Sequence, residues 1–440
     1  MTRAFLCLLS LMLLFAMTSC DSDSPPDAPE PMSFDIGGKT AADILGDPHY
    51  RAISYGGYRE DTREIQPTIP QLKEDMRILS AMGIRVLRTY NVHYDEAENL
   101  LKAIRELREE DEDFEMYVML GAWIDAKNSW TDEPERIRDQ DAPRNEVEIA
   151  RAVELTQEFP EIVKIMAVGN EAMVHWATEY YVEPSIILNW VNHLQDLKAE
   201  GQLPEELWIT SSDDFASWGG GGEEYHNEDL NALYEAVDFV SMHTYPMHNT
   251  HYNPEFWGVR AEEEGLNDLE KVHNAMDRSL ELSIKHYNDV VAYMHSIGVD
   301  KPVHIGETGW ATISNEMYGE GGANAIDEYK MGLFHDMMRE WSDENNISVF
   351  YFEAFDEPWK DAENPLGSEN HFGLINLDAE AKYPLWDAVD AGVFDGLTRD
   401  GQPITKTYGG DKDALMEDVL VPPTHEEIMR RLEGEQQAGL

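Results

Sequence analysis

Short apolar runs alternate with amphipathic stretches along most of this chain. The apolar runs are rich in Val, Ile and Met without strict alternation, which is typical of β-strands covered on both faces. They lie at residues 51–59, 84–91, 116–124, 162–171, 207–214, 238–246, 302–310 and 347–355. The stretches between them repeat apolar residues every three to four positions and predict helices, for example at residues 69–82, 95–109, 147–159 and 186–199.

Eight strand-plus-helix units predict an α/β fold, specifically a (β/α)8 or TIM barrel. A doubly wound open sheet is the structural alternative, but it does not explain why polar and aromatic residues gather where so many of the strands end. We expect the barrel to occupy residues 36–395. Residues 396–440 are expected to form a C-terminal extension that packs on the barrel or is partly disordered.

The first 35 residues have a different composition from the rest. Residues 1–19 combine Arg3, an apolar core and small residues, which predicts an export signal. Met17-Thr18-Ser19-Cys20 resembles a bacterial lipoprotein cleavage box, so we expect lipidation at Cys20, with ordinary signal cleavage as the alternative. Residues 20–35 are acidic and proline-rich and predict a disordered tether. The protein is therefore expected to be exported to the cell envelope, at the outer membrane or cell surface, and to meet the membrane only through its anchor.

Cysteine content and charge limit the partners. The only two cysteines, Cys7 and Cys20, lie in the leader region, so the mature fold is expected to contain no internal disulfide. The chain has 87 acidic and 33 basic residues and a net charge of −54, which disfavours nucleic acid as a partner. The acidic excess is either a solvated surface or an adaptation to salt. We expect a monomer.

Two glutamates stand at strand ends and carry the candidate chemistry. The fourth run ends at Glu171 and the seventh contains Glu307, and parallel barrel strands bring their C-terminal ends to one face. Cleaving a glycosidic bond requires a proton for the departing oxygen and an anion or activated water on the opposite face, which two carboxyl groups supply. Their environments must differ, so that one stays protonated and the other ionised. Asn170 is placed to bind a sugar hydroxyl beside Glu171, and Tyr245 to donate a hydrogen bond to Glu307.

Polar and aromatic residues at the other strand ends are candidate sugar contacts, although each alone fits a packing role. Those selected from the strand ends are Tyr55, Arg88, Tyr90, Trp123, Asn170, His243, Tyr245, Trp310 and Phe355. Seven of the eleven tryptophans lie at or after strand ends, and indole faces stack on pyranose rings. We expect two or three of them to plug the barrel mouth and the rest to contact sugar. The seven are Trp123, Trp130, Trp176, Trp218, Trp257, Trp310 and Trp359.

Over residues 50–390 the chain resembles glycoside hydrolase family 17, the β-1,3-glucanases and β-1,3-glucan transferases. The resemblance is carried by Val168-Gly169-Asn170-Glu171, His243-Thr244-Tyr245-Pro246, Gly306-Glu307-Thr308-Gly309-Trp310 and the segment from Phe352 to Lys360. It implies a barrel, retention of anomeric configuration, Glu171 as acid/base and Glu307 as nucleophile. It also implies that Tyr90 and Tyr245 line the cleaved-bond subsite, with Glu357 and Lys360 in a polar cluster nearby, and that no metal or cofactor is needed.

The function predicted is a retaining β-1,3-glucan hydrolase acting on laminarin-type substrates. A β-1,3-glucanosyltransferase on the same barrel and a catalytically silent surface glycan-binding lipoprotein remain alternatives. Residues 128–145 and 218–227 have no counterpart in the family pattern, which leaves endo or exo action open. A retaining mechanism predicts about 5–5.5 Å between the two carboxyl groups.

Overall fold

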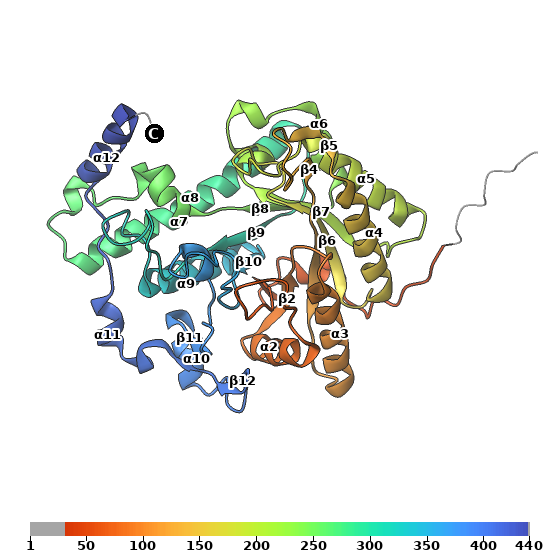
Figure 1. Cartoon of the computed structure of the whole chain (residues 1–440), viewed down its shortest axis with the longest axis horizontal. Coiled ribbons are helices and arrows are strands. Elements are labelled where there is room, and N and C mark those ends of the chain that lie inside the picture. The colour runs from red at the N-terminus through yellow and green to blue at the C-terminus, as the bar shows by residue number, and fades with distance from the viewer. Residues whose placement is uncertain (1–30, 439–440) are drawn as a thin grey trace, which may run out of the picture.

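The computed structural model describes residues 31–438, and its centre is a closed barrel of eight parallel strands (Figure 1). The strands neighbour one another in the order β1-β10-β9-β8-β7-β6-β3-β2. The predicted TIM barrel is confirmed. Its strands are β1 (Arg51–Ser54), β2 (Ile84–Arg88), β3 (Tyr117–Ala122), β6 (Val163–Asn170), β7 (Trp208–Asp214), β8 (Val240–His243), β9 (Val303–Gly309) and β10 (Val349–Phe352).

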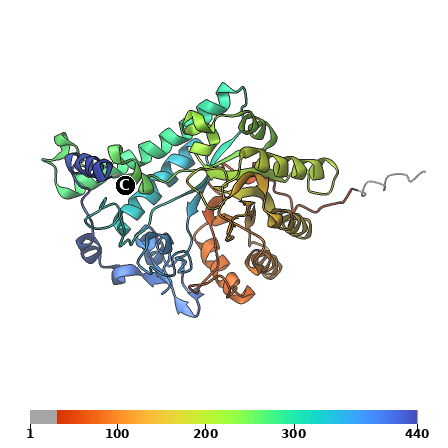
Figure 2. The ribbon, with the colours of Figure 1, turned by 45° about the horizontal axis from the view of Figure 1, so that its top comes forward.

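Helices surround the barrel, as the turned view shows (Figure 2). Thr68 accepts a hydrogen bond from the Gln71 backbone and so caps α2, while Pro143 and Pro184 occupy the first turns of α4 and α5, where a missing N–H costs nothing. The helices are α1 (Ala41–Ile44), α2 (Ile69–Ala81), α3 (Asp95–Glu110), α4 (Pro143–Glu158), α5 (Pro184–Ala199), α6 (Glu228–Ala236), α7 (Pro246–Tyr252), α8 (Asp268–Ser296) and α9 (Glu328–Asn345).

The hydrophobic core has two parts because each strand is buried on both faces. The larger cluster includes Ile53, Leu87 and Val118 and lies between the barrel and its helices. The smaller cluster includes Ala52, Val86 and Phe350. Neighbouring residues of one strand therefore enter different clusters, as the pleat of a strand requires.

Two short hairpins are added to the barrel. A hairpin of β4 (Ala126–Lys127) and β5 (Ile137–Asp141) follows β3. The C-terminal part contributes a second hairpin, whose Arg399 Nε lies 3.1 Å from Asp75 of α2, and Thr424 forms a bridge with Val259. This part contains α10 (Trp386–Asp390), β11 (Glu380–Ala381), β12 (Thr398–Arg399), β13 (Gln402–Pro403), β14 (Thr405–Lys406), α11 (Lys412–Glu417) and α12 (His425–Ala438).

The predicted export signal at residues 1–19, the lipidation site Cys20 and most of the tether lie outside the described residues. Between residues 31 and 438, no helix has both the length and the apolar character to cross a membrane.

Candidate active site

The two glutamates meet at the C-terminal face of the barrel. Glu171 directly follows β6, Glu307 lies within β9, and a carboxylate oxygen of each lies within 4.8 Å of the other. The chain turns sharply before Glu171: Gly169 has φ 79° and Glu171 itself φ 47°. A left-handed backbone at a residue other than glycine is strained, and such strain is found where a side chain must be aimed. This separation suits the shorter class of carboxyl pairs, in which one group attacks the sugar directly.

Three donors hold Glu307 as a carboxylate. Tyr245 donates its hydroxyl to Oε1 at 2.6 Å, Tyr90 donates to Oε2 at 2.7 Å, and Arg88 donates to the same Oε2. Burial raises the pKa of Glu307, but the charges of protonated His243 and of Arg88 and the two tyrosine hydroxyls outweigh burial and bring it to about 2. Glu307 is therefore ionised at every ordinary pH.

Glu171 has the opposite electrostatic setting. Burial, followed by the negative charge of Glu307, raises its pKa well above the usual value. His243 Nδ1 lies 3.0 Å from Glu171 Oε1, and Nε2 lies 2.7 Å from Ser212 Oγ. Burial lowers the pKa of His243 to about 4, so the ring is neutral at pH 7 and the standing positive charge beside the pair is that of Arg88. Glu171 thus keeps its proton while Glu307 is ionised. Cleavage of an acetal by two carboxyl groups requires this difference in protonation state.

Arg88 connects the two sides of the site. Besides Glu307, its guanidinium donates to Asn170 Oδ1 at 2.5 Å, and its side chain is 1% exposed. Because the oxygen of the Asn170 amide is engaged in this way, its NH₂ group remains to face the cleft that Asn170 lines.

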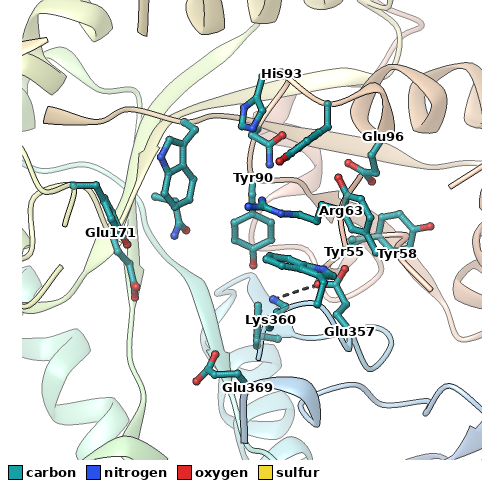
Figure 3. Close-up of a pocket in the computed structure, with 18 of the residues that line it drawn as sticks. Tyr55, Tyr58, Arg63, Tyr90, His93, Glu96, Glu171, Glu357, Lys360 and Glu369 are labelled. Atoms are coloured by element: carbon teal, nitrogen blue, oxygen red, sulfur yellow. Dashed lines mark ion pairs between the residues drawn. The ribbon is translucent and has the colours of Figure 1, made fainter. Parts of the chain in front are cut away.

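A cleft of about 630 Å³ runs across the pair and has different chemistry at its two ends. Beside Glu171, Trp123 and Trp130 both donate their indole N–H to buried Asp125, and Tyr180 stacks on Trp130 with 5.8 Å between ring centres. The other end is shown in Figure 3, where Tyr58, Arg63, Glu96 and Glu357 gather on the opposite side of Tyr90 from Glu171. The cleft therefore offers stacking surfaces and hydrogen-bonding groups on both sides of the pair.

Lys360 neutralises part of the acidic charge on the cleft floor. Its ammonium lies 3.2 Å from Glu357 and 3.3 Å from Glu353, both nearly fully buried. Burial lowers the pKa of Lys360, but these carboxylates more than offset the effect, and the net shift is upward. Burial raises the pKa of Glu353 well above its usual value.

The predicted sugar contacts fall into two groups. Tyr55, Tyr90, Trp123, Asn170, Glu357 and Lys360 line the cleft together with the pair. Arg88, His243 and Tyr245 lie behind the pair and contact Glu307 or Glu171. Glu96, Arg63 and Glu369 also line the cleft, and no sequence pattern pointed to them.

The prediction that Trp310 and Phe355 contact sugar was wrong. Trp310 is fully buried, donates its indole N–H to Ala325 and packs on Phe334 of α9. Phe355 is 1% exposed and lies against Tyr55 and the Arg399 guanidinium. Both side chains pack in the interior and cannot reach a sugar in the cleft. Trp218 and Trp257 are likewise fully buried, so three of the seven strand-end tryptophans have a packing role.

The nitrogen and oxygen atoms of Glu171, His243 and Glu307 also lie close enough together to resemble a metal-binding group. Both oxygens of Glu307, however, already accept hydrogen bonds, and the Arg88 cation contacts one of them. A cation at this position would face the charge of Arg88, so the arrangement fits a proton-transferring pair better than a metal site.

Comparison with known proteins provides a family context. A family model described as the BtgE/BtgC glycoside hydrolase domain matches residues 52–373. The putative glucan endo-1,3-beta-glucosidase btgC of Aspergillus niger is 25% identical over 336 residues, which cover 72% of this chain and 40% of that protein. The glucan 1,3-beta-glucosidase of Arthroderma benhamiae is 39% identical over 88 residues, 18% of this chain and 27% of that protein. The match to the Aspergillus niger relative thus spans two fifths of its length.

Solved structures give a fuller match. An endo-laminarinase from Formosa Hel1_33_131 is 60% identical, with a TM-score of 0.87 over 88% of this chain and 98% of that chain. An active-site mutant of the Rhizomucor miehei beta-1,3-glucanosyltransferase in complex with laminaritriose is 21% identical, with a TM-score of 0.51 over 74% of this chain and 93% of that chain. This second likeness concerns the fold alone.

Proposed function

This chain belongs to the BtgE/BtgC glycoside hydrolase domain family, and we propose that it hydrolyses internal linkages of β-1,3-glucans such as laminarin. The observation that carries the proposal is the pair of Glu171 and Glu307 at strand ends, within 4.8 Å and with pKa values displaced in opposite directions. The 60% identity to an endo-laminarinase supports the substrate and the internal mode of attack.

The proposed reaction follows from the protonation states. Glu307 attacks the anomeric carbon, the bond to the leaving oxygen breaks, and Glu171 gives that oxygen its proton. The product is a glycosyl ester on Glu307 and an ionised Glu171. Glu171 then removes a proton from water, which attacks the same carbon and releases Glu307 as a carboxylate. Two inversions give overall retention of configuration.

The test is to follow laminarin products by NMR and by chain length. The proposal expects the β-anomer first and oligosaccharides of mixed length from the start. The α-anomer first would reject Glu307 as the nucleophile, whereas steady release of one short product would reject internal attack. Products longer than an oligosaccharide substrate would favour the glucanosyltransferase alternative, and binding without any cleavage would favour a silent glycan-binding protein.

We infer that the protein is exported and anchored to the cell envelope through lipidated Cys20, because residues 1–20 have the order of an export signal that ends in a lipoprotein box. The test compares wild type with Cys20→Ser by membrane fractionation. Wild type should sediment with membranes, since a lipoprotein carries more than one acyl chain, and the variant should be released or remain unprocessed. A soluble wild-type protein that begins after Cys20 would overturn the inference.

A further inference from the structure

The end of the cleft remote from Glu171 contains buried polar groups that the proposed reaction does not use. Glu96 lies in the first turn of α3 and lines the cleft, yet it is only 6% exposed. Its Oε1 has no hydrogen-bond partner among the residues that the structure describes, and the same holds for Nε1 of Trp359 in the loop after β10. Buried polar atoms normally find partners, so such atoms at a cleft indicate groups that a ligand satisfies.

The surroundings of Glu96 have the chemistry of a sugar site. The Arg63 guanidinium lies 4.2 Å from the ring centre of Trp359 and 5.0 Å from that of Tyr94. The three planar groups together form one wall. The carboxyl of Glu357 lies against Gly56, where a Cβ would come within 2.2 Å of Oε1, so only glycine leaves it room. Carboxyl groups and an indole N–H bind sugar hydroxyls, and aromatic faces stack on pyranose rings.

The direction of the substrate follows from the proposed roles of the pair. Glu171 protonates the leaving oxygen, so the leaving part lies on its side, and the units that precede the attacked sugar extend away from it. Figure 3 places Glu96 and Glu357 on the far side of Tyr90 from Glu171. Tyr90 donates to Glu307, and Lys360 lies 5.8 Å from the Tyr90 ring centre and 3.2 Å from Glu357, so the cleft floor continues from Glu307 to this end.

We propose that Glu96, Glu357 and Trp359 form a sugar subsite for a glucosyl unit on the non-reducing side of the one attacked by Glu307, and that Glu96 determines which linkage is cleaved. The inference rests on the proposed β-1,3-glucan activity. An oligosaccharide that fills this subsite is cut further from its non-reducing end than one that leaves it empty. The subsite therefore favours internal cleavage over release of single glucose units.

The protonation state of Glu96 supports this role. Burial, and then the charge of Glu357, raises its pKa to about 8, so the carboxyl is neutral at pH 7 and can donate a hydrogen bond to a sugar hydroxyl. Glu357 after β10 and Tyr55 and Tyr58 from the segment between β1 and α2 interact electrostatically with Glu96. The charged groups of Arg63 and Lys360 line the same cleft. Above about pH 8 the donor is lost and a second negative charge appears beside Glu357.

The experiment measures bond choice and KM on reducing-end-labelled laminaripentaose for wild type, Glu96→Ala and Glu96→Gln. Glu98→Gln is the matched control, because Glu98 lies on the same helix but pairs with Lys102 and Arg151 outside the cleft. We expect Glu96→Ala to raise KM about tenfold and to shift cleavage toward the non-reducing end. Glu96→Gln, which stays neutral and keeps a hydrogen-bond donor, should shift KM and bond choice at pH 7 much less than Glu96→Ala. It should also lack the rise in KM that we expect of wild type above about pH 8.

Three outcomes would overturn the proposal. The first is an unchanged cleavage pattern in Glu96→Ala. The second is an equal loss at every bond in Glu96→Ala together with a lower melting temperature, which would mean a structural role. The third is a Glu96→Gln variant with the same rise in KM above about pH 8 as wild type. Calorimetric binding of laminaripentaose to Glu307→Gln, with and without Glu96→Ala, measures the subsite without turnover. If wild type binds laminaripentaose but does not cleave it, the proposed function is wrong. Weaker binding caused by Glu96→Ala would then still support the subsite, and equal binding would reject it.

Discussion

The two carboxyl groups make separable contributions to the proposed reaction. Glu171→Gln removes the proton donor and Glu307→Gln removes the nucleophile, and water replaces each poorly. We expect each variant to lower kcat on laminarin by about 10³-fold or more while its melting curve stays close to that of wild type.

Chemical rescue tells the two roles apart. With an activated aryl glycoside, azide should restore turnover of Glu171→Ala and give a β-glycosyl azide, because it attacks the glycosyl ester from the open face. Azide with Glu307→Ala should instead give an α-glycosyl azide, because it takes the place of the nucleophile. The same azide anomer from both variants would contradict the assignment, as would near-wild-type activity in either.

The acid limb of the pH profile tests the contacts of Glu307. Tyr245→Phe removes the 2.6 Å hydrogen bond that helps to hold the pKa of Glu307 at about 2, so that pKa must rise. A hydrogen bond to a charged group contributes about 1.5–3 kcal/mol, and one pKa unit corresponds to about 1.36 kcal/mol. We therefore expect the acid limb of kcat/KM to move up by about one to two pH units.

The basic limb should respond differently. It reports loss of the proton from Glu171, whose pKa burial and the charge of Glu307 raise, and activity falls as pH rises through that value. Tyr245→Phe leaves both causes in place, so this limb should hardly move. Tyr408→Phe, an exposed tyrosine bonded to Asp418, serves as the control. An unmoved acid limb in Tyr245→Phe would show that this hydroxyl does not set the charge state of Glu307.

Some individual residues could be predicted from the sequence and others could not. Glu171 and Glu307 could be predicted because each lies at or near the end of an apolar run and barrel strands end on one face. Trp310 was misplaced because an aromatic residue at a strand end can point into the cleft or outward to the helices, and composition does not distinguish the two. Glu96 was missed because acidic residues are common in the first turn of a helix, where they complement the helix dipole.

At the scale of elements, the apolar runs located all eight barrel strands but overestimated several lengths. The run at residues 51–59 contains a strand only at Arg51–Ser54, and that at 347–355 only at Val349–Phe352. The residues beyond these strands leave the ladder and build the cleft or its supports, as Tyr55 and Phe355 do. Helix α4 begins at Pro143, before the predicted residue 147, because periodicity does not register a proline that opens a helix.

The C-terminal hairpin is tied to the barrel by a buried charge that sequence patterns did not reveal. Asp75 of α2 is fully buried and binds Arg59, Arg399 of β12 and the Tyr55 hydroxyl, with Arg59 Nη2 at 2.9 Å and the hydroxyl at 2.9 Å. Asp75→Asn leaves the buried Arg399 guanidinium without its counter-charge and removes one of the two carboxylates that pair with Arg59. Breaking a buried ion pair costs about 3–5 kcal/mol.

We expect denaturant melts of Asp75→Asn to show that loss in the free energy of unfolding. The matched control is Asp400→Asn, which removes a carboxylate that also pairs with Arg59 but is 39% exposed, so its loss should cost less than about 1 kcal/mol. Equal costs for the two variants would show that burial of Asp75 adds nothing to the attachment of the hairpin.

At the scale of the whole molecule, charge is the dominant feature. The chain has 87 acidic residues and only 33 basic ones, so the basic residues can neutralise the charge of only a minority of the acids. Several basic residues, such as Arg59, Lys73 and Arg151, already contact two acids each. Most of the remaining acids therefore repel one another, and this repulsion opposes the compact state at low ionic strength.

Salt should consequently stabilise the fold without much effect on substrate binding. The Debye length falls from about 10 Å at 0.1 M to about 3 Å at 1 M, so repulsion between surface carboxylates is largely screened across this range. A β-1,3-glucan is neutral, and its contacts with the cleft involve no net charge that salt could weaken. We expect the melting temperature to rise steadily with NaCl up to about 1 M while KM for laminarin changes less than about twofold. If the acids were merely solvated, the melting temperature would stay flat or fall, and that result would reject adaptation to salt while leaving the roles of Glu171 and Glu307 untouched.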